Sequence, residues 1–168
     1  MGTLQFLPPI EDKEKYLAEI RNRHVWLLKM GGEKVMYLKR RWEGDRCTAC
    51  WDSVRRQSTK EGCLICYGTG FVGGYYNPIE MTVSLISPAS KKVLIQDHGM
   101  IIERMQSSWT LWEPQLQPRD IFVLMLDGRR IEVTEVTPTK WRGIILRQNF
   151  EYREIEETSI AYKIPIPV

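Results

Sequence analysis

Four cysteines stand in two closely spaced pairs, and the chain contains no others. The pairs are Cys47-Thr-Ala-Cys50 and Cys63-Leu-Ile-Cys66, with twelve residues between them. A CxxC turn places two sulfur atoms on one side of a tight loop, so two facing turns supply the tetrahedral shell that Zn²⁺ prefers. The spacing therefore predicts a zinc site whose ligands are Cys47, Cys50, Cys63 and Cys66.

Disulfides and redox chemistry are the alternatives for these cysteines. Disulfides suit secreted chains, but residues 1–9 lack the basic start and long apolar core of a signal peptide. A redox CxxC is a single pair in a thioredoxin-like βαβ setting, and two pairs occur here without one. Catalytic zinc keeps one position open, whereas four sulfurs close the shell, so we expect a structural ion. Tetrahedral thiolates also accept iron, so zinc versus iron stays open.

Length and charge limit the remaining interpretations. A chain of 168 residues is long enough to bury a core that does not depend on the metal. Its net charge of +3, from 24 basic and 21 acidic residues, is too balanced to indicate nucleic-acid binding by itself. Local basic groups occur at Lys39-Arg40-Arg41 and at Arg55-Arg56. No apolar run reaches the length of a membrane span, and we expect a protein that is made in the cytoplasm with reduced cysteines.

The N-terminal part predicts one amphipathic helix. Pro8-Pro9 precedes a run of acidic residues suited to a first helical turn, so the helix is expected from about Glu11 to Met30, before Gly31-Gly32. Apolar positions recur at spacings of three and four on one face. They are Tyr16, Leu17, Ile20, His24, Leu27 and Leu28. We interpret His24 as a packed side chain and not as a metal ligand.

The middle of the chain is expected to be built around the cysteine turns. Residues 35–38 fit either a strand or a second short helix, and we favour a strand that leads to the first turn. The polar tract 51–62 is expected to be an exposed loop whose arginines are solvated, with contact to phosphate or an acidic partner as the alternative. The glycines within 67–76 allow the positive φ values needed to turn the backbone under the metal.

From Pro78 onward the sequence favours short β-strands separated by turn residues. The clearest hairpin joins 121–126 to 129–136 through Asp127-Gly128. The other expected strands are 81–86, 92–96, 143–150 and 158–164. Five or six such strands predict an antiparallel barrel or sandwich. The fold class is therefore α+β, with a helix, a zinc-ribbon-like module and a C-terminal β domain.

No catalytic motif emerges from the sequence. The chain has two histidines, and His98 lies in an apparent turn beside Asp97. There is no nucleophile elbow, no zinc-protease helix and no phosphate-binding loop. We therefore expect a protein that is not an enzyme and has no catalytic residues.

The cysteine and glycine block, together with Pro78-Ile79, resembles a zinc-bearing virion structural protein of tailed bacteriophages. The later segments 118–120, 127–133, 141–143 and 162–165 are similar to head-tail connector and stopper proteins of the phage neck. The resemblance implies a β-barrel subunit with extended arms in a homo-oligomeric ring. It also implies neighbours among portal, neck and tail proteins, contact with packaged DNA, and a location in the virion.

Tryptophans and one long segment are the expected contact points of such a ring. Trp109, Trp112 and Trp141 are amphipathic anchors that suit either subunit contacts or ordinary core packing. The interval 106–117 is expected to be a long loop that reaches a neighbouring ring or the DNA channel. Residues before Pro8 are expected to form an arm that orders on assembly.

Two other functions are alternatives to a phage structural protein. A zinc ribbon fused to a β domain can bind nucleic acid, and Lys39-Arg40-Arg41 with Trp51, Tyr75 and Tyr76 suits phosphate contacts and base stacking. The stretch 63–70 also matches the CxxCxGxG unit of cochaperones with cysteine-rich modules. That family repeats the unit four times and carries a His-Pro-Asp signature, which this chain lacks.

The same patterns divide the chain into three parts. Residues 1–42 hold the arm, the helix and the leading strand. Residues 43–80 form the zinc-binding module, which contains few apolar residues and is expected to need the metal for order. Residues 81–168 form the antiparallel β domain.

Overall fold

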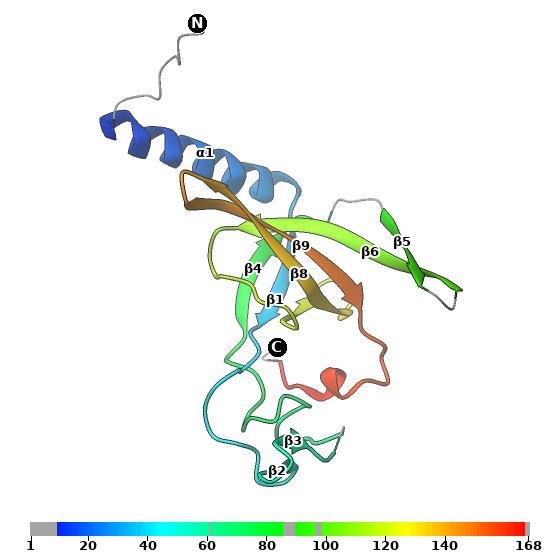
Figure 1. Cartoon of the computed structure of the whole chain (residues 1–168). Coiled ribbons are helices and arrows are strands. Elements are labelled where there is room, and N and C mark those ends of the chain that lie inside the picture. The colour runs from blue at the N-terminus through cyan, green and yellow to red at the C-terminus, as the bar shows by residue number, and fades with distance from the viewer. Residues whose placement is uncertain (1–9, 61, 86–89, 97–98, 167–168) are drawn as a thin grey trace, which may run out of the picture.

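The computed structural model describes residues 10–60, 62–85, 90–96 and 99–166. The chain forms one long helix, nine strands and a short 3-10 helix over these residues (Figure 1). In chain order they are α1 (Ile10–Gly31), β1 (Glu33–Leu38), β2 (Trp51–Asp52), β3 (Gln57–Ser58), β4 (Ile79–Val83), β5 (Ser90–Gln96), β6 (Gly99–Leu111), β7 (Ile121–Leu124), β8 (Arg130–Trp141), β9 (Ile144–Glu154) and η1 (Ile160–Lys163). The α+β class predicted from the sequence is therefore confirmed.

Seven of the strands form a single antiparallel sheet in the order β4-β1-β7-β8-β9-β6-β5. The sheet curls until β4 and β6 meet at one isolated bridge, where the backbones of Ser84 and Trp109 exchange hydrogen bonds of 2.9 and 3.3 Å. In the described residues the bridge does not continue as a ladder, and residues 99–105 of β6 pair with β5. The expected closed barrel or sandwich is therefore wrong, and the sheet remains open.

The hydrophobic core fills the inside of this curl. Tyr37, Phe122 and Phe150 pack in series, with ring centroids 5.4 and 5.3 Å apart. The other buried members of this cluster are Val35, Val83, Leu116, Leu124, Ile131, Val133 and Tyr152. Successive residues of a strand point to opposite faces, and all four residues of β7 are buried. Both faces of β7 are therefore covered, which explains why its sequence is continuously apolar.

The second face of β1 and β7 packs against the C-terminal segment. Leu38, Ile121 and Val123 cluster there with Ala161 and Ile164. The predicted strand 158–164 is wrong, because Ser159 caps the 3-10 helix η1 by accepting a hydrogen bond from the backbone N–H of Ala161. A capping side chain offers the backbone a local partner in place of a ladder.

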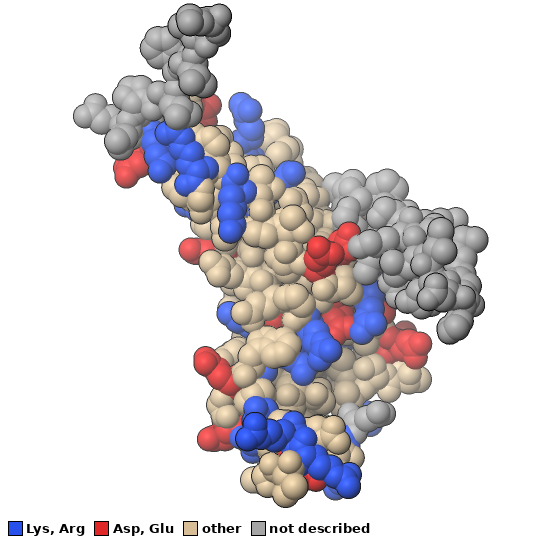
Figure 2. All heavy atoms as spheres, viewed as in Figure 1, with Lys and Arg blue, Asp and Glu red and all other residues tan. Residues whose placement is uncertain are grey.

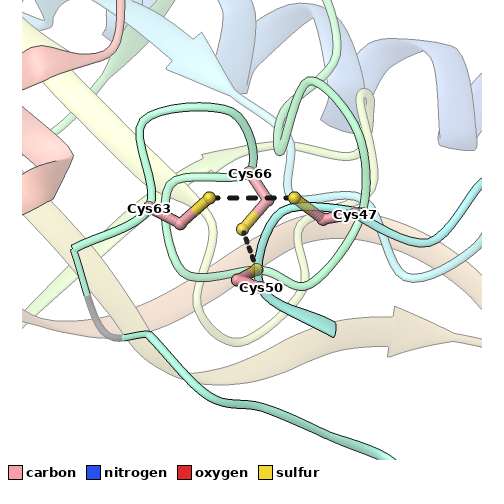
Figure 3. Close-up of side chains that lie close together, drawn as sticks. All are labelled: Cys47, Cys50, Cys63 and Cys66. Carbon is pink, nitrogen blue, oxygen red and sulfur yellow. Dashed lines mark hydrogen bonds between the residues drawn. The ribbon is translucent and has the colours of Figure 1, made fainter. Parts of the chain in front are cut away.

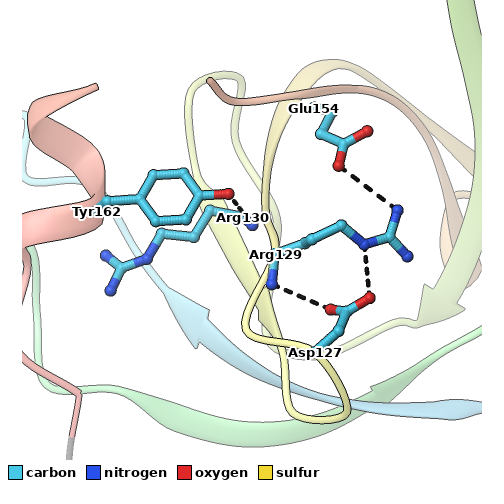
Figure 4. Close-up of polar contacts among 5 residues, drawn as sticks. All are labelled: Asp127, Arg129, Arg130, Glu154 and Tyr162. Carbon is cyan, nitrogen blue, oxygen red and sulfur yellow. Dashed lines mark hydrogen bonds and ion pairs between the residues drawn. The ribbon is translucent and has the colours of Figure 1, made fainter. Parts of the chain in front are cut away.

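A buried arginine fastens this C-terminal segment to the sheet (Figure 4). The guanidinium of Arg130 donates to the carbonyls of Ala161 and Ile164, and the backbone N–H of Arg130 donates to the hydroxyl of Tyr162 at 3.2 Å. Next to it, Arg129 closes the β7–β8 turn by pairing with Asp127. The positive φ of Gly128 fits the predicted Asp-Gly turn, so the expected hairpin is confirmed.

Helix α1 lies across β6 and β9 at one end of the curled sheet (Figure 1). It confirms the predicted helix, and it ends where the N–H of Gly32 donates to the carbonyl of Leu28. A side chain at position 32 would lie 2.4 Å from Thr82 and 2.5 Å from that carbonyl oxygen, so only glycine fits there. The predicted apolar face is only partly covered, since Leu28 is buried whereas Tyr16 and Leu27 are 49 % and 44 % exposed.

The expected long loop 106–117 is half wrong, because residues 106–111 belong to β6 and pair with β9. Only the part after Leu111 is a loop, and the buried amide of Gln148 holds it in place. Its Nε2 donates to the carbonyls of Leu111 and Pro114, and its Oε1 accepts from the N–H of Leu116 at 2.8 Å. The loop is therefore tied down on the sheet.

Two of the three tryptophans singled out from the sequence pack against α1. The ring of Trp109 lies edge-on to His24 at 5.6 Å, and the guanidinium of Arg21 lies 4.4 Å from the ring centroid of Trp112. Trp141 is stacked by Arg142 in the turn between β8 and β9. These contacts fit the packing interpretation, and a role of the tryptophans in subunit contacts stays a prediction.

Candidate metal centre

The structure brings the four predicted ligands together in one buried cluster (Figure 3). Their sulfur atoms all lie within 4.8 Å of one another. The Sγ–Sγ distance is 3.7 Å between Cys47 and Cys63 and 3.3 Å between Cys50 and Cys66. Zn–S bonds of about 2.3 Å in a tetrahedron separate sulfur atoms by about 3.8 Å. The four sulfurs are therefore spaced as a tetrahedral metal ion such as zinc requires.

Backbone hydrogen bonds shape the first cysteine turn. The N–H groups of Cys50 and Trp51 both donate to the carbonyl of Cys47, at 3.4 and 2.9 Å. The carbonyl of Cys50 in turn accepts from both the N–H and the hydroxyl of Thr59, at 2.7 and 3.0 Å. The polar tract after this turn, expected to be an exposed loop, is exposed but also forms the small β2–β3 ladder. Thr59, near the end of the tract, is thus hydrogen-bonded to the cysteine turn.

Glycines shape the second turn, as the sequence predicts. The N–H of Tyr67 donates to the carbonyl of Cys63, and Thr69 donates to the carbonyl of Cys66 through both its N–H and its hydroxyl. Gly74 has φ +65°, and a side chain there would lie 2.5 Å from the carbonyl oxygen of Cys66. This close approach requires glycine, because any Cβ would collide with backbone atoms.

The electrostatics of the cluster favour a bound cation. Burial raises the pKa of Cys50 to about 12 and also raises the pKa of Cys66. The backbone N–H groups of Cys66 and Ile65 hydrogen-bond to the sulfur of Cys63 and lower the pKa of that thiol to about 6. Buried thiolates need compensating charge. A divalent ion held by the four cysteines would supply that charge and take the place of the thiol protons.

All four cysteines are free, and their sulfur atoms are too far apart for the bond of about 2.05 Å that a disulfide requires. The donor set consists of four sulfurs and nothing else, which suits zinc or iron in a closed structural shell. Among the described residues, no other group of histidine, cysteine or carboxylate side chains comes together in this way. His24 packs on Trp109. His98 and Asp97 lie outside the described residues.

The metal-binding module is joined to the sheet by paired backbones and by aromatic rings. The N–H of Arg41 donates to the carbonyl of Gly74, and the N–H of Tyr76 donates to the carbonyl of Lys39. Tyr67 and Tyr75 pack against the apolar cluster on the outer face of β1 and β7. The module follows directly from the end of β1, which lies between β4 and β7 in the sheet.

One buried carboxylate fixes the same junction. Asp120 accepts hydrogen bonds from the hydroxyl of Tyr37 at 2.7 Å, the N–H of Arg40 at 2.9 Å and the N–H of Gln117 at 2.7 Å. Burial raises the pKa of Asp120, and these hydrogen bonds oppose the rise. Sequence reasoning missed this residue, since a single aspartate before an apolar strand carries no signal of its own.

Sequence reasoning also missed an arginine that lies between two rings of the module. The guanidinium carbon of Arg46 is 3.9 Å from the ring centroid of Trp51 and 4.1 Å from that of Phe71. Residues 46 and 71 also form an isolated bridge. Trp51, directly after the first cysteine turn, was the available signal for this packing. The contact covers one side of the module with stacked planar groups.

No protein-family model matches this chain, and no curated protein is significantly similar to it. In the part of the chain that the structure describes, no helix is both long and apolar enough to cross a membrane. The fold and the cysteine cluster are therefore the basis on which a function has to be argued.

Proposed function

We propose that the protein is a noncatalytic structural subunit of a tailed-phage virion that acts at the head-to-tail junction. In this proposal the subunits form a homo-oligomeric ring that contacts portal, neck or tail proteins. The four cysteines hold a structural zinc ion that stiffens a docking module. The proposal starts from the resemblance of the cysteine and glycine block to a phage virion structural protein and of the later segments to head-tail connector and stopper proteins, and the surface of the molecule supports the role.

The observation that carries the proposal is the apolar surface left open on α1. Trp26 and Met30 are 59 % and 71 % exposed, and Leu27 lies between them. A groove of about 380 Å³ runs along the same helix beside Tyr16, Ile20 and Leu27. Several large apolar side chains gathered on one element are typical of a protein-binding surface, whereas single exposed ones are common everywhere.

The hairpin of β5 and β6 adds a second feature of the same kind. It extends beyond the rest of the sheet on the side away from the free end of α1 (Figure 1). Its register pairs Val93 with Ile102, Leu94 with Ile101 and Ile95 with Met100, so apolar residues fill consecutive positions of both strands. Such runs are typical of strands covered on two faces. A projecting hairpin and an apolar helix face are unlike features, and contacts between unlike parts of identical subunits are head-to-tail, which close into a ring when the rotation between subunits allows it.

The proposal is tested by measuring the mass and shape of the purified full-length chain. Light scattering combined with particle imaging should show closed rings that carry one zinc ion per chain. Trp26→Glu should shift the equilibrium to monomers by placing a charge in the subunit contact. Val54→Glu, at an 89 % exposed position on the β2–β3 tip, is the matched control and should leave the rings intact. A chain that stays monomeric at every concentration would contradict the proposal.

A further inference from the structure

A groove of about 470 Å³ lies where the chain passes from β1 into the metal-binding module. Its lining includes Lys39, Arg40, Trp42 and Tyr76. The rings of Trp42 and Tyr76 are 49 % and 37 % exposed, so both remain accessible in a groove that also holds two cations. Glu43 is the one carboxylate among the residues that line the groove. The lining thus combines open aromatic surface with excess positive charge.

Each of the two rings is held by a neighbouring arginine. The guanidinium carbon of Arg40 lies 4.9 Å from the ring centroid of Trp42, and that of Arg41 lies 4.7 Å from the ring centroid of Tyr76. The backbone N–H of Arg40 is bonded to Asp120, and Nε of Arg41 donates to the carbonyl of Tyr75 at 3.3 Å. The rings are therefore oriented before any ligand arrives, and the entropy lost on binding is reduced.

The charge of the chain is concentrated in the same region. Residues 39–78 contain seven Lys and Arg and four Asp and Glu, a balance of +3 that equals that of the whole chain, and a zinc ion held by four thiolates would add −2 at the buried cluster. The rest of the chain is therefore neutral overall. Figure 2 shows Lys and Arg gathered over the end of the molecule that holds β2 and β3. The exposed cations at this end of the molecule attract an anionic partner at close range.

We propose that this groove binds single-stranded nucleic acid. Bases stack on Trp42 and Tyr76, and the phosphates lie against Lys39 and Arg40. Unstacked bases offer planar faces to aromatic side chains, which the stacked bases of a duplex do not. A single strand uses both features of the groove, since its bases stack on the rings and its phosphates pair with the cations. An acidic protein partner would use the cations but would leave the exposed rings unexplained. The proposal does not depend on the phage assignment, because it rests on this groove alone.

The test is fluorescence anisotropy of labelled oligo(dT) and oligo(rU) with the zinc-loaded full-length protein at about 50 mM salt. Binding of either strand, weakening as salt is added, is the expected result, and the preferred strand identifies DNA or RNA as the ligand. Trp42→Ala should raise Kd about tenfold by removing one stacking ring. Trp42→Phe, which keeps a ring, should stay within about twofold.

Matched controls separate the groove from the rest of the surface. Leu126→Ala removes an 88 % exposed apolar side chain from the β7–β8 turn, outside both the groove and the α1 surface, and should leave Kd unchanged. The fall of log K with log salt should become less steep by about 0.7 in Lys39→Gln, the value for one lost phosphate contact to a single strand. Lys34→Gln, whose lysine pairs with Glu80 at the surface, should not change the slope.

Three results would overturn the inference. They are no binding of either strand at low salt, equal loss of affinity in the Trp42→Ala and Leu126→Ala variants, or duplex binding as tight as single-strand binding. Light scattering of the same samples reports ring formation independently. Failure of the groove and failure of the ring can therefore be told apart.

Discussion

The metal-binding module and the curled sheet are ordered by different forces. The sheet buries a core in which Tyr37, Phe122 and Val133 are fully inaccessible. In the described residues of 43–78, the only buried apolar side chain apart from the cysteines is Phe71, while Val54, Leu64 and Ile65 are exposed. A segment with so little apolar burial does not offset the entropy of ordering its chain. We therefore expect the module to depend on a bound metal ion for its order and the sheet not to.

Loss of one ligand should have the largest effect and should separate the two regions. Cys63→Ser should release the metal and unfold the module, because structural zinc contributes about 10–16 kcal/mol of apparent binding free energy in small peptides. Amide hydrogen exchange should become fast across 45–75. The strands of the sheet should keep their protection and the circular dichroism its β signal.

Ile65→Ser is the matched control, since this half-exposed residue lies in the same turn. It should keep one metal ion per chain. Unchanged metal content in Cys63→Ser would refute the ligand assignment, and collapse of the whole sheet would show that the two regions do not order separately.

Removal of an aromatic ring from the core should weaken the sheet and leave the metal site intact. Phe122→Ala leaves a cavity between Tyr37 and Phe150 and should lower the free energy of unfolding by about 3–5 kcal/mol. The purified protein should still carry its metal when folded. Denaturant titration with metal analysis measures both, and Met125→Ala, at a 53 % exposed position beside β7, should cost little. Metal loss in the folded Phe122→Ala protein would contradict the claim that the sheet and the module are ordered independently.

A change at Asp120, where the sheet meets the metal-binding module, should affect both regions. Asp120→Asn keeps the shape of the side chain but removes one of the two acceptors that serve Tyr37, Arg40 and Gln117. A buried donor left without its partner costs about 1–3 kcal/mol, so we expect a loss of about 2 kcal/mol. Hydrogen exchange should speed up at the end of β1 and also in the module. The exposed Asp45→Asn is the control, and faster exchange in only one region would place Asp120 outside the junction.

The contact between α1 and the sheet should give the smallest effect, and it depends on pH. Burial and the nearby Arg147 lower the pKa of His24 below 6.5. The unfolded chain then binds the proton more readily, so the stabilising contribution of neutral His24 is present above pH 6.5 and is lost as the pH falls below it. Between about pH 7.5 and about pH 5.5 the wild type should lose no more than about 2 °C of Tm relative to His24→Gln. Parallel pH profiles of the two proteins would show that His24 takes no part.

The sequence predicted best where the physical signal is local. The CxxC pairs, the helix before Gly31-Gly32 and the Asp127-Gly128 hairpin each follow from residues close together in the chain, and all three are present. The position of β1 between β4 and β7 was not predictable, because it depends on pairing across more than 40 residues. The proposed division into three parts does not express this pairing and stays a prediction.

The errors arose where a local pattern had two solutions. Alternating apolar residues at 158–164 suit a strand, but Ser159 favours a capped turn and Arg130 satisfies the carbonyls of Ala161 and Ile164 from outside. Polar residues at 106–108 suggested a loop, although β9 supplies a ladder partner for each of them. Closure of the sheet was predicted from the number of strands, which does not reveal that β6 pairs with β5 over half its length.

The most direct test of the central claim is native mass spectrometry of the full-length chain, with elemental analysis and thiol alkylation of the same sample. The account predicts one zinc ion per chain and four cysteines that resist alkylation until a chelator removes the ion. A metal-free chain whose thiols react at once while residues 45–75 keep their amide protection would contradict it.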